Sequence, residues 1–303
     1  MTLLSVNAAV ADTQSPDVAA IKTIVESVAV LADSGNFEAL EKLYLDEIHV
    51  DYTSLSGGEP ELKSPRALMS EWAGVLPGFD RTRHEISSID VTVTPPRAVA
   101  TADVVADHYV AGLFWQVQGS YRYELDDTGD GWRIAAMTFN LQREQGTRDV
   151  FGPAIENAAA NPPSYLKRQQ TADVVRAFLA SLEEKDMEKL ASLWADDAVQ
   201  DMPYSPEGHP RRVVGREDLV DLYSGWPANS GAADFTSQLV FYPMQDPETV
   251  FVEFKGDVEV IPTGRGYKQT YGGVFHVVNG KIRLFREYFD PVPFAWAFGM
   301  DED

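Results

Sequence analysis

Hydrophobic residues recur every three or four positions over residues 18–31 and again over residues 174–182. This spacing gives each segment one apolar face and therefore predicts two amphipathic helices. The positions are Val18, Ile21, Ile24, Val25, Val28 and Leu31 in the first segment, and Val174, Val175, Phe178, Leu179 and Leu182 in the second.

The same series of elements follows each predicted helix. Gly35 is predicted to end the first helix. Asn36 in the first copy and Asp186 in the second are predicted to cap a short second helix. A strand, a third helix and three or four long alternating strands come next. Three helices followed by an antiparallel sheet predict an α+β fold.

The chain repeats itself after about 150 residues, and the repeat can be checked by subtraction. Later in the copies the offset becomes 149, where "DGWRIAAMTF" (130–139) lies over "NGKIRLFREY" (279–288). A period this long indicates duplicated domains and not a solenoid. Five pairs of identical residues are 150 positions apart: Leu40 and Leu190, Leu43 and Leu193, Asp46 and Asp196, Asp51 and Asp201, and Arg66 and Arg216.

The repeat places domain 1 at residues 12–150, a linker at 151–164 and domain 2 at 165–300. The linker reads "FGPAIENAAANPPS", which is rich in Ala, Asn and Pro and could hold a short helix.

The composition narrows the function classes. The 303 residues are 44% hydrophobic, which is ample for two buried cores, and their net charge is -22. This charge has the wrong sign for nucleic acid or an anionic membrane surface, and no apolar run approaches the ~20 residues of a membrane-spanning helix. The absence of cysteine excludes disulfides, thiol nucleophiles and thiolate metal ligands.

The N-terminus bears on cellular location. "MTLLSVNAAVADTQSP" contains small residues at Ala9 to Ala11 that fit a signal-peptide cleavage site, but it lacks a basic segment and its apolar stretch is short. We therefore expect a cytoplasmic protein with an ordinary frayed terminus, and a periplasmic protein is the alternative.

Domain 1 holds an acid, a phenol and two imidazoles that could meet in one apolar pocket: Asp33, Tyr52, His84 and His108. Strand alternation puts His84 and His108 on faces with small or apolar neighbours, and Tyr52 on a face with Ile48. Such a set suits proton abstraction next to a carbonyl group. No metal is needed, and the set has none of the short spacings of a zinc site.

Simpler interpretations stand beside this one. Taken alone, either histidine is more often a structural residue than a base, and Asp33 could be a solvated acid at a helix end. His49 falls on the opposite face from Tyr52 and is expected to be exposed. Asp51 could simply hold the turn after its strand.

Domain 2 has lost this set. Met202 replaces Tyr52, Glu183 replaces Asp33, Phe235 takes the His84 position and Glu259 lies near the His108 position.

Domain 2 offers Glu287 instead, in "LFREYFDP", on a face with Phe285 and Phe289 where burial would raise its pKa. An ion pair with a neighbouring Arg is the alternative. His209, in a loop, could bind a ligand or lie at the surface. The aromatic end "FDPVPFAWAFG" (289–299) would cover a cavity or pack between the domains.

Several motifs resemble a known family. "ADSGNFEALEKLY", "VDYTSLSGG", "LPGFDRTRHEI" and "DGWRIAAMT" resemble SnoaL-like proteins of the scytalone dehydratase branch. "LWADDAV", "PEGHPRRVVGRE", "GGVFHVVNGKI" and "REYFDP" resemble the SnoaL and phenazine-biosynthesis type. The resemblance implies two cones of the nuclear transport factor 2-like kind, each with a strongly curved antiparallel sheet wrapped around three helices and a central cavity.

The resemblance also implies roles. In domain 1 it implies a His base paired with Asp33, Tyr52 acting on a carbonyl through water, and loss of water from a cyclic β-hydroxy carbonyl compound. The dehydratase pattern has a second Tyr where this chain has Ala32. Domain 1 therefore keeps only one of the two phenols that would polarise the carbonyl group, unless another phenol or Trp72 reaches into the cavity. In domain 2 it implies that Glu287 acts as an acid.

We therefore expect a cofactor-independent lyase or isomerase acting on a small hydrophobic carbonyl compound in the domain 1 cavity. The alternative is a non-catalytic ligand-binding or pseudo-dimeric scaffold protein. No phosphate-binding loop, dinucleotide fingerprint or nucleophile elbow is found, so no cofactor is expected. We expect no nucleic-acid or membrane partner, and an internal pseudo-dimer of the two domains. The predicted ligand contacts are Trp72, Phe114, Phe139, Asp201 and Tyr271.

Overall fold

The computed structural model describes residues 15–300 and divides them into two compact units, with the boundary between Tyr165 and Leu166. The signal-peptide interpretation concerns residues outside this described range. None of the helices between residues 15 and 300 is long and apolar enough to span a membrane.

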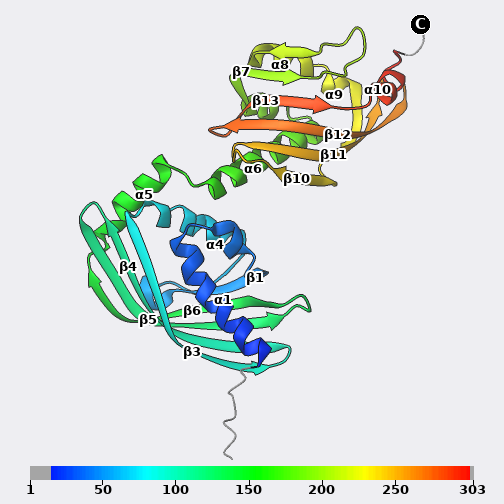
Figure 1. Ribbon diagram of the computed structural model, residues 1–303. Helices are drawn as coiled ribbons and strands as arrows, with labels where there is room; N and C mark the ends of the chain where they lie inside the picture. Colours follow the sequence, from blue (N-terminus) through cyan, green and yellow to red (C-terminus); the bar gives the residue numbers. More distant parts are fainter. Residues whose placement is uncertain (1–14, 301–303) are drawn as a thin grey trace, which may run out of the picture. The chain divides into compact units, whose positions relative to one another are not determined.

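The first unit combines one long helix and several shorter ones with four long strands (Figure 1). Its elements are α1 (Pro16–Asp33), α2 (Phe37–Glu41), β1 (Tyr44–Asp51), α3 (Thr53–Ser56), β2 (Glu61–Lys63), α4 (Pro65–Ala73), η1 (Leu76–Gly78), β3 (Arg81–Thr94), β4 (Arg97–Val110), β5 (Leu113–Asp127), β6 (Trp132–Gly146), η2 (Arg148–Val150) and α5 (Phe151–Ala160).

The second unit repeats this order after α6, in which the boundary between the units falls. Its elements are α6 (Ser164–Glu184), α7 (Met187–Leu193), β7 (Trp194–Asp201), β8 (Arg212–Val214), α8 (Arg216–Tyr223), α9 (Trp226–Asn229), β9 (Ser230–Asp234), β10 (Leu239–Pro243), β11 (Thr249–Val260), β12 (Arg265–Val278), β13 (Lys281–Tyr288) and α10 (Pro291–Ala297).

Each unit has one sheet. The strand order is β2-β1-β6-β5-β4-β3 in the first and β10-β11-β12-β13-β7-β8 in the second, where β9 also pairs with β11. The expected α+β fold with two cone domains is confirmed. The strands pair antiparallel except for β1 with β6 and β7 with β13, which are parallel. Parallel strands need a long connection, and several helices and strands lie between the two partners in each unit.

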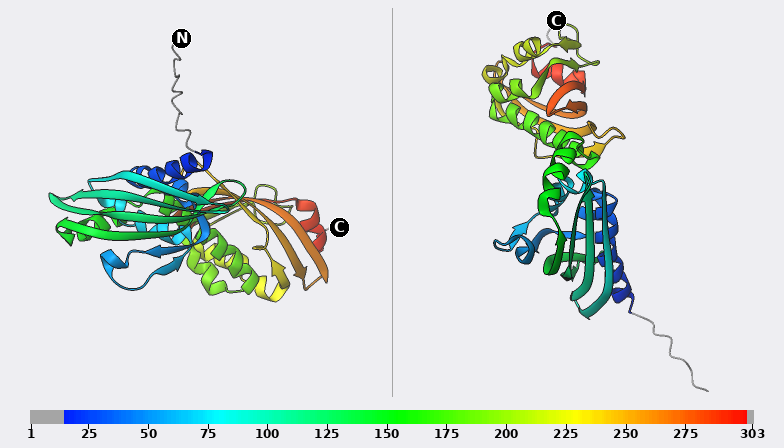
Figure 2. Two further views of the ribbon diagram at one scale, coloured as in Figure 1. Left: turned by 90° about the horizontal axis from the view of Figure 1, so that it is seen from below. Right: turned by 90° about the vertical axis from the view of Figure 1, so that its left-hand side faces the viewer.

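The first helix of each unit forms as its apolar spacing predicts. In domain 1 the buried face of α1 consists of Ile21, Val25, Val28, Ala29 and Ala32, and the helix lies along the curved sheet next to β3 (Figure 1). Figure 2 shows the same sheet from two further sides, with α1 on one side of it.

The predicted caps also form. The Asn36 side chain accepts a hydrogen bond from the backbone N–H of Ala39, and the Asp186 side chain accepts one from Lys189. These caps set where the second helix of each unit begins. In domain 1 the cap lies three residues after the end of the first helix at Asp33.

The segment 151–164, which the sequence predicts to be a linker, contains α5 and lies in the first unit. Ala154 and Ala158 of α5 are buried against Gly78, whose missing side chain allows the contact: a Cβ there would lie 1.7 Å from the Ala154 carbonyl oxygen. The Asn157 side chain donates a hydrogen bond of 3.1 Å to the Gly78 carbonyl. Small residues in this segment therefore serve helix packing and not chain flexibility.

Candidate functional site

Each unit encloses its own cavity between the sheet and the helices. The domain 1 cavity has a volume of about 320 Å³, at the small end for ligand sites. Most of its wall is apolar or aromatic. The side chains that line it include Val28, Ala29, Ala32, Tyr52, Trp72, His84, Ile86, Ala106, His108, Trp115, Val117, Tyr121, Tyr123 and Phe139.

Asp33 does not line the cavity itself, but it forms a hydrogen-bonded pair with His84, which does. Asp33 is the last residue of α1, and its carboxylate lies 2.7 Å from Nδ1 of His84 on β3. The same carboxylate accepts hydrogen bonds from the His84 backbone N–H at 2.7 Å and from the Thr82 hydroxyl at 2.8 Å. The acid is thus fixed by three donors from one strand.

This pairing lowers the pKa of Asp33 and orients the His84 ring. Burial alone would raise the pKa of Asp33, but the hydrogen bonds from His84 and Thr82 outweigh it and leave the pKa lowered. An ionised carboxylate can only accept, so Nδ1 of His84 donates this hydrogen bond and Nε2 is the ring nitrogen left for a substrate. Since His84 lines the cavity, this ring is available as a base.

His108 on β4 lies beside His84 but differs in character. The two ring centroids are 5.5 Å apart, and the His108 ring also contacts Phe79 and Trp115. The residue is only 5% exposed, and burial, assisted by His84, lowers its pKa to about 4. Its Nδ1 has no hydrogen-bond partner among the described residues. His108 is therefore a neutral part of the wall near pH 7.

The lowered pKa of His108 predicts a loss of stability in acid. The unfolded chain takes up a proton below about pH 6.5 whereas the folded chain does so only near 4, so the free energy of unfolding should fall by up to about 3 kcal/mol across this window. Replacing His108 with leucine should flatten the pH profile in urea unfolding. His49→Gln, at an exposed site, is the control, and a profile equally steep in His108→Leu and wild type would contradict the assignment.

Three phenols share the domain 1 cavity. The hydroxyl of Tyr52, in the turn directly after β1, lies 3.3 Å from that of Tyr121 on β5. Tyr123 stands two residues further along the same strand face, and its hydroxyl has no hydrogen-bond partner among residues 15–300. Burial raises the pKa of all three phenols, so they remain donors.

Sequence reasoning missed Tyr121 and Tyr123. The signal was present, because Trp115, Val117, Tyr121 and Tyr123 alternate along one strand and all line the cavity. The resemblance places a second phenol at position 32, and the alanine found there lines the cavity. Tyr121 thus places a second phenol beside Tyr52 from another element.

The residues predicted to contact ligand differ in whether they line a cavity. Trp72 and Phe139 line the domain 1 cavity, and Tyr271 lines that of domain 2. Phe114 does not reach the cavity, since it points to the opposite face of β5 from Trp115 and stacks on Tyr109 at 4.9 Å.

The two aspartates at the strand ends have structural roles. Asp51 accepts hydrogen bonds from the backbone N–H and the hydroxyl of Thr53, at 2.9 and 2.7 Å, and so holds the turn that carries Tyr52. Asp201, predicted to contact ligand, does not line the cavity, because its carboxylate is engaged by Arg212 and Arg286 at 3.1 Å each.

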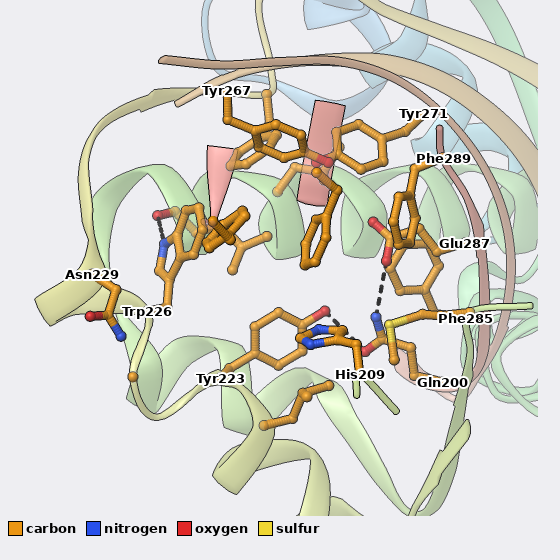
Figure 3. Close-up of a pocket in the computed structure, with 18 of the residues that line it drawn as sticks. Gln200, His209, Tyr223, Trp226, Asn229, Tyr267, Tyr271, Phe285, Glu287 and Phe289 are labelled. Atoms are coloured by element: carbon orange, nitrogen blue, oxygen red, sulfur yellow. Dashed lines mark hydrogen bonds between the residues drawn. The ribbon is translucent and has the colours of Figure 1, made fainter. Parts of the chain in front are cut away.

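The domain 2 cavity has a volume of about 340 Å³ and is strongly aromatic (Figure 3). Trp226, Tyr267 and Tyr271 surround the same space as Glu287 on β13. The C-terminal segment with α10 covers this cavity through Phe294 and Phe298. His209 also lines it, with its ring 5.0 Å from that of Phe294.

Glu287 is the polar centre of this cavity. The Gln200 side-chain amide donates a hydrogen bond of 3.2 Å to its carboxylate, and the Tyr223 hydroxyl donates one of 2.9 Å to the Gln200 carbonyl oxygen (Figure 3). Burial raises the pKa of Glu287 to about 7, against the effect of Gln200. The alternative of an ion pair with a neighbouring Arg is wrong, because Arg286 pairs with Asp201.

The acid at the end of the first helix makes corresponding hydrogen bonds in the two copies. Glu183, at the Asp33 position, accepts the backbone N–H groups of Phe235 and Thr236 and the Thr236 hydroxyl. The acid at the end of the first helix thus accepts backbone N–H groups in both domains, from β3 in domain 1 and from the segment directly after β9 in domain 2, but only domain 1 adds an imidazole.

The residue that corresponds to His108 is Val258 and not Glu259. Across the sheet His108 pairs with Thr82, two residues before His84, and Val258 pairs with Ala233, two residues before Phe235. Val258 is also buried, as His108 is, whereas Glu259 is exposed. A shift of one residue had turned the predicted side chain to the wrong face.

Two models of the SnoaL-like domain match the chain, one over residues 13–138 and one over residues 175–285. The uncharacterized protein YesE of Bacillus subtilis is 36% identical over 131 residues, which are 43% of this chain and 88% of that protein. An uncharacterized PhzA/B-like protein of Pseudomonas aeruginosa is 30% identical over 121 residues, or 40% of this chain and 84% of that protein. The crystal structure of a candidate isomerase from Bacillus subtilis is 32% identical, with a TM-score of 0.41 and coverage of 44% of this chain and 95% of that one.

Proposed function

Because the chain belongs to the SnoaL-like family and carries two of its domains in tandem, we propose that domain 1 is a cofactor-independent lyase or isomerase. It acts on a small, largely apolar carbonyl compound bound in the cavity of about 320 Å³. The hydrogen bond between Asp33 and His84, at the wall of a cavity that also holds paired phenols, is the observation that supports this proposal most.

The base is Nε2 of His84, which removes a proton from the carbon next to the carbonyl group. Asp33 holds the ring in the required tautomer and stabilises the imidazolium that forms. The proton then returns to a different carbon in an isomerisation, or it leaves with a β-hydroxyl group as water in a dehydration.

The phenols stabilise the enolate that develops on the carbonyl oxygen. Tyr52 and Tyr121 share one hydrogen bond, so that one of their two hydroxyl hydrogens remains for the substrate. The Tyr123 hydroxyl, which has no partner among the described residues, is a second donor in the same wall. Donors of this kind act strongly in a cavity shielded from water.

Exchange of carbonyl-adjacent protons for deuterium tests this proposal without knowledge of the natural substrate. In heavy water, 2-tetralone and related cyclic ketones are incubated with the protein, and proton NMR follows the loss of the signal next to the carbonyl. Catalysed exchange supports the proposal. A ketone that binds the protein in calorimetry but exchanges at the buffer rate supports the alternative, a non-catalytic ligand-binding domain.

Tyr121→Phe should slow the catalysed exchange about 10- to 100-fold, because the variant loses one donor to the developing oxyanion. Tyr109→Phe is the matched control: Tyr109 lies on β4 outside the cavity lining and should leave the exchange rate unchanged. Equal rates for wild type and Tyr121→Phe would remove Tyr121 from the mechanism.

A further inference from the structure

The domain 2 cavity has one acidic group and no basic group that could neutralise it. Among the described residues that line it, Glu287 is the single carboxylate, and neither Lys nor Arg occurs. The titratable side chains around Glu287 are Tyr223 on α8, Tyr267 and Tyr271 on β12, and His209 in the loop after β7. Burial lowers the pKa of His209, so it supplies no positive charge near pH 7.

The hydrogen bonds around Glu287 favour the ionised carboxylate. The Tyr223 hydroxyl donates to the Gln200 carbonyl oxygen at 2.9 Å, which orients the amide so that its NH₂ group points to Glu287 at 3.2 Å. The Gln200 NH₂ group is a donor, and an ionised Glu287 carboxylate is the acceptor that matches it. Gln200 is the only hydrogen-bond partner of Glu287 in the described chain, so the carboxylate has acceptor capacity left for a ligand.

The remaining wall suits a cation as well. Trp226, Tyr267, Tyr271 and Phe289 present aromatic rings around the same space (Figure 3). Aromatic faces attract an ammonium group, and most strongly where water is excluded. A carboxylate without a basic partner inside an aromatic enclosure is complementary to a ligand that brings the positive charge itself.

We propose that the domain 2 cavity binds a small aromatic or alicyclic primary amine, with the ammonium group on Glu287 and the ring system among Trp226, Tyr267 and Tyr271. The site is separate from the proposed catalytic site of domain 1 and does not depend on it. A neutral carbonyl ligand would require a protonated Glu287 as donor, which the donor of Gln200 opposes.

Three matched probes test this proposal on the full chain by calorimetry: 1-naphthylmethylamine, 1-naphthylmethanol and 1-naphthylacetate. At about pH 8.5 the amine should bind at least about tenfold more tightly than the alcohol, since a charge-assisted hydrogen bond replaces a neutral one, and the anion should bind worst. Below the pKa of Glu287, about 7, the carboxylate must first lose a proton, so the affinity for the amine should fall about tenfold per pH unit.

Glu287→Gln should remove the preference for the amine over the alcohol. Glu188→Gln, the same change at an exposed site on α7, should keep it. The wild-type pH profile is a second readout if the Glu287 variant folds poorly. An amine affinity that is absent, equal to that of the alcohol or unchanged in Glu287→Gln would overturn the proposal, as would alcohol binding that strengthens when the pH falls through 7.

Discussion

Replacing His84 with alanine is expected to slow catalysed carbonyl-adjacent proton exchange by about 10²- to 10⁴-fold, the usual contribution of a general base. The loss should fall on the rate at saturating ketone and not on ketone binding, because the ring takes the proton only in the transition state. Proton NMR of the exchange at several ketone concentrations separates the two.

The stability of the His84 variant should be nearly that of wild type. The Asp33 carboxylate keeps its hydrogen bonds from the Thr82 hydroxyl and the backbone N–H of residue 84, neither of which needs the imidazole. His84→Gln provides a bulkier variant if alanine unfolds the domain, and His49→Ala at the surface is the control. Exchange that persists at more than half the wild-type rate in a folded His84 variant would exclude His84 as the base.

Replacing Asp33 with alanine is expected to reduce both stability and activity. The variant leaves the Thr82 hydroxyl, the His84 backbone N–H and the imidazole without their acceptor, which should cost about 3–5 kcal/mol of the free energy of unfolding of domain 1. Because the folded-state pKa of Asp33 is lowered, its contribution is present above its ordinary pKa of 3.8 and is lost as the pH falls through the folded value.

Domain 2 supplies the matched variant for this prediction. Glu183→Ala removes the corresponding hydrogen bonds to Phe235 and Thr236, so it should destabilise domain 2 and leave proton exchange by domain 1 unchanged. Amide hydrogen exchange followed by mass spectrometry locates each effect, at the end of α1 and in β3 for Asp33→Ala, and at the end of α6 and around residues 235–236 for Glu183→Ala. Full stability and full activity in Asp33→Ala would contradict the roles given to the Asp33 hydrogen bonds.

The fold could be predicted from the sequence because its signals are local and occur twice. The helical spacing around Val25 and Val175 and the caps at Asn36 and Asp186 each define an element, and the repeat lets one copy check the other. The convergence of Asp33 and His84 was also predictable, given the resemblance to the dehydratase branch. The expected packing of the two domains as a pseudo-dimer stays a prediction.

The missed and mistaken positions share a physical cause. Along a strand the side chains alternate between two faces, so Phe114 was expected in a cavity that its neighbour Trp115 lines instead. In the same way Glu259 was placed near the His108 position, where its neighbour Val258 is the buried residue. Tyr121 was overlooked because its meeting with Tyr52 depends on how β5 and the turn after β1 come together in space. Register and curvature of a sheet are properties of the folded chain and not of a short sequence window.

The most direct test of the central claim is the rate of deuterium incorporation into 2-tetralone by the full chain near neutral pH, measured by proton NMR for wild type and His84→Ala. The account predicts saturable exchange above the buffer rate for wild type and exchange close to the buffer rate for the variant. Binding of the ketone in the domain 1 cavity without any acceleration by the wild-type protein would contradict it, and domain 1 would then be a ligand-binding domain.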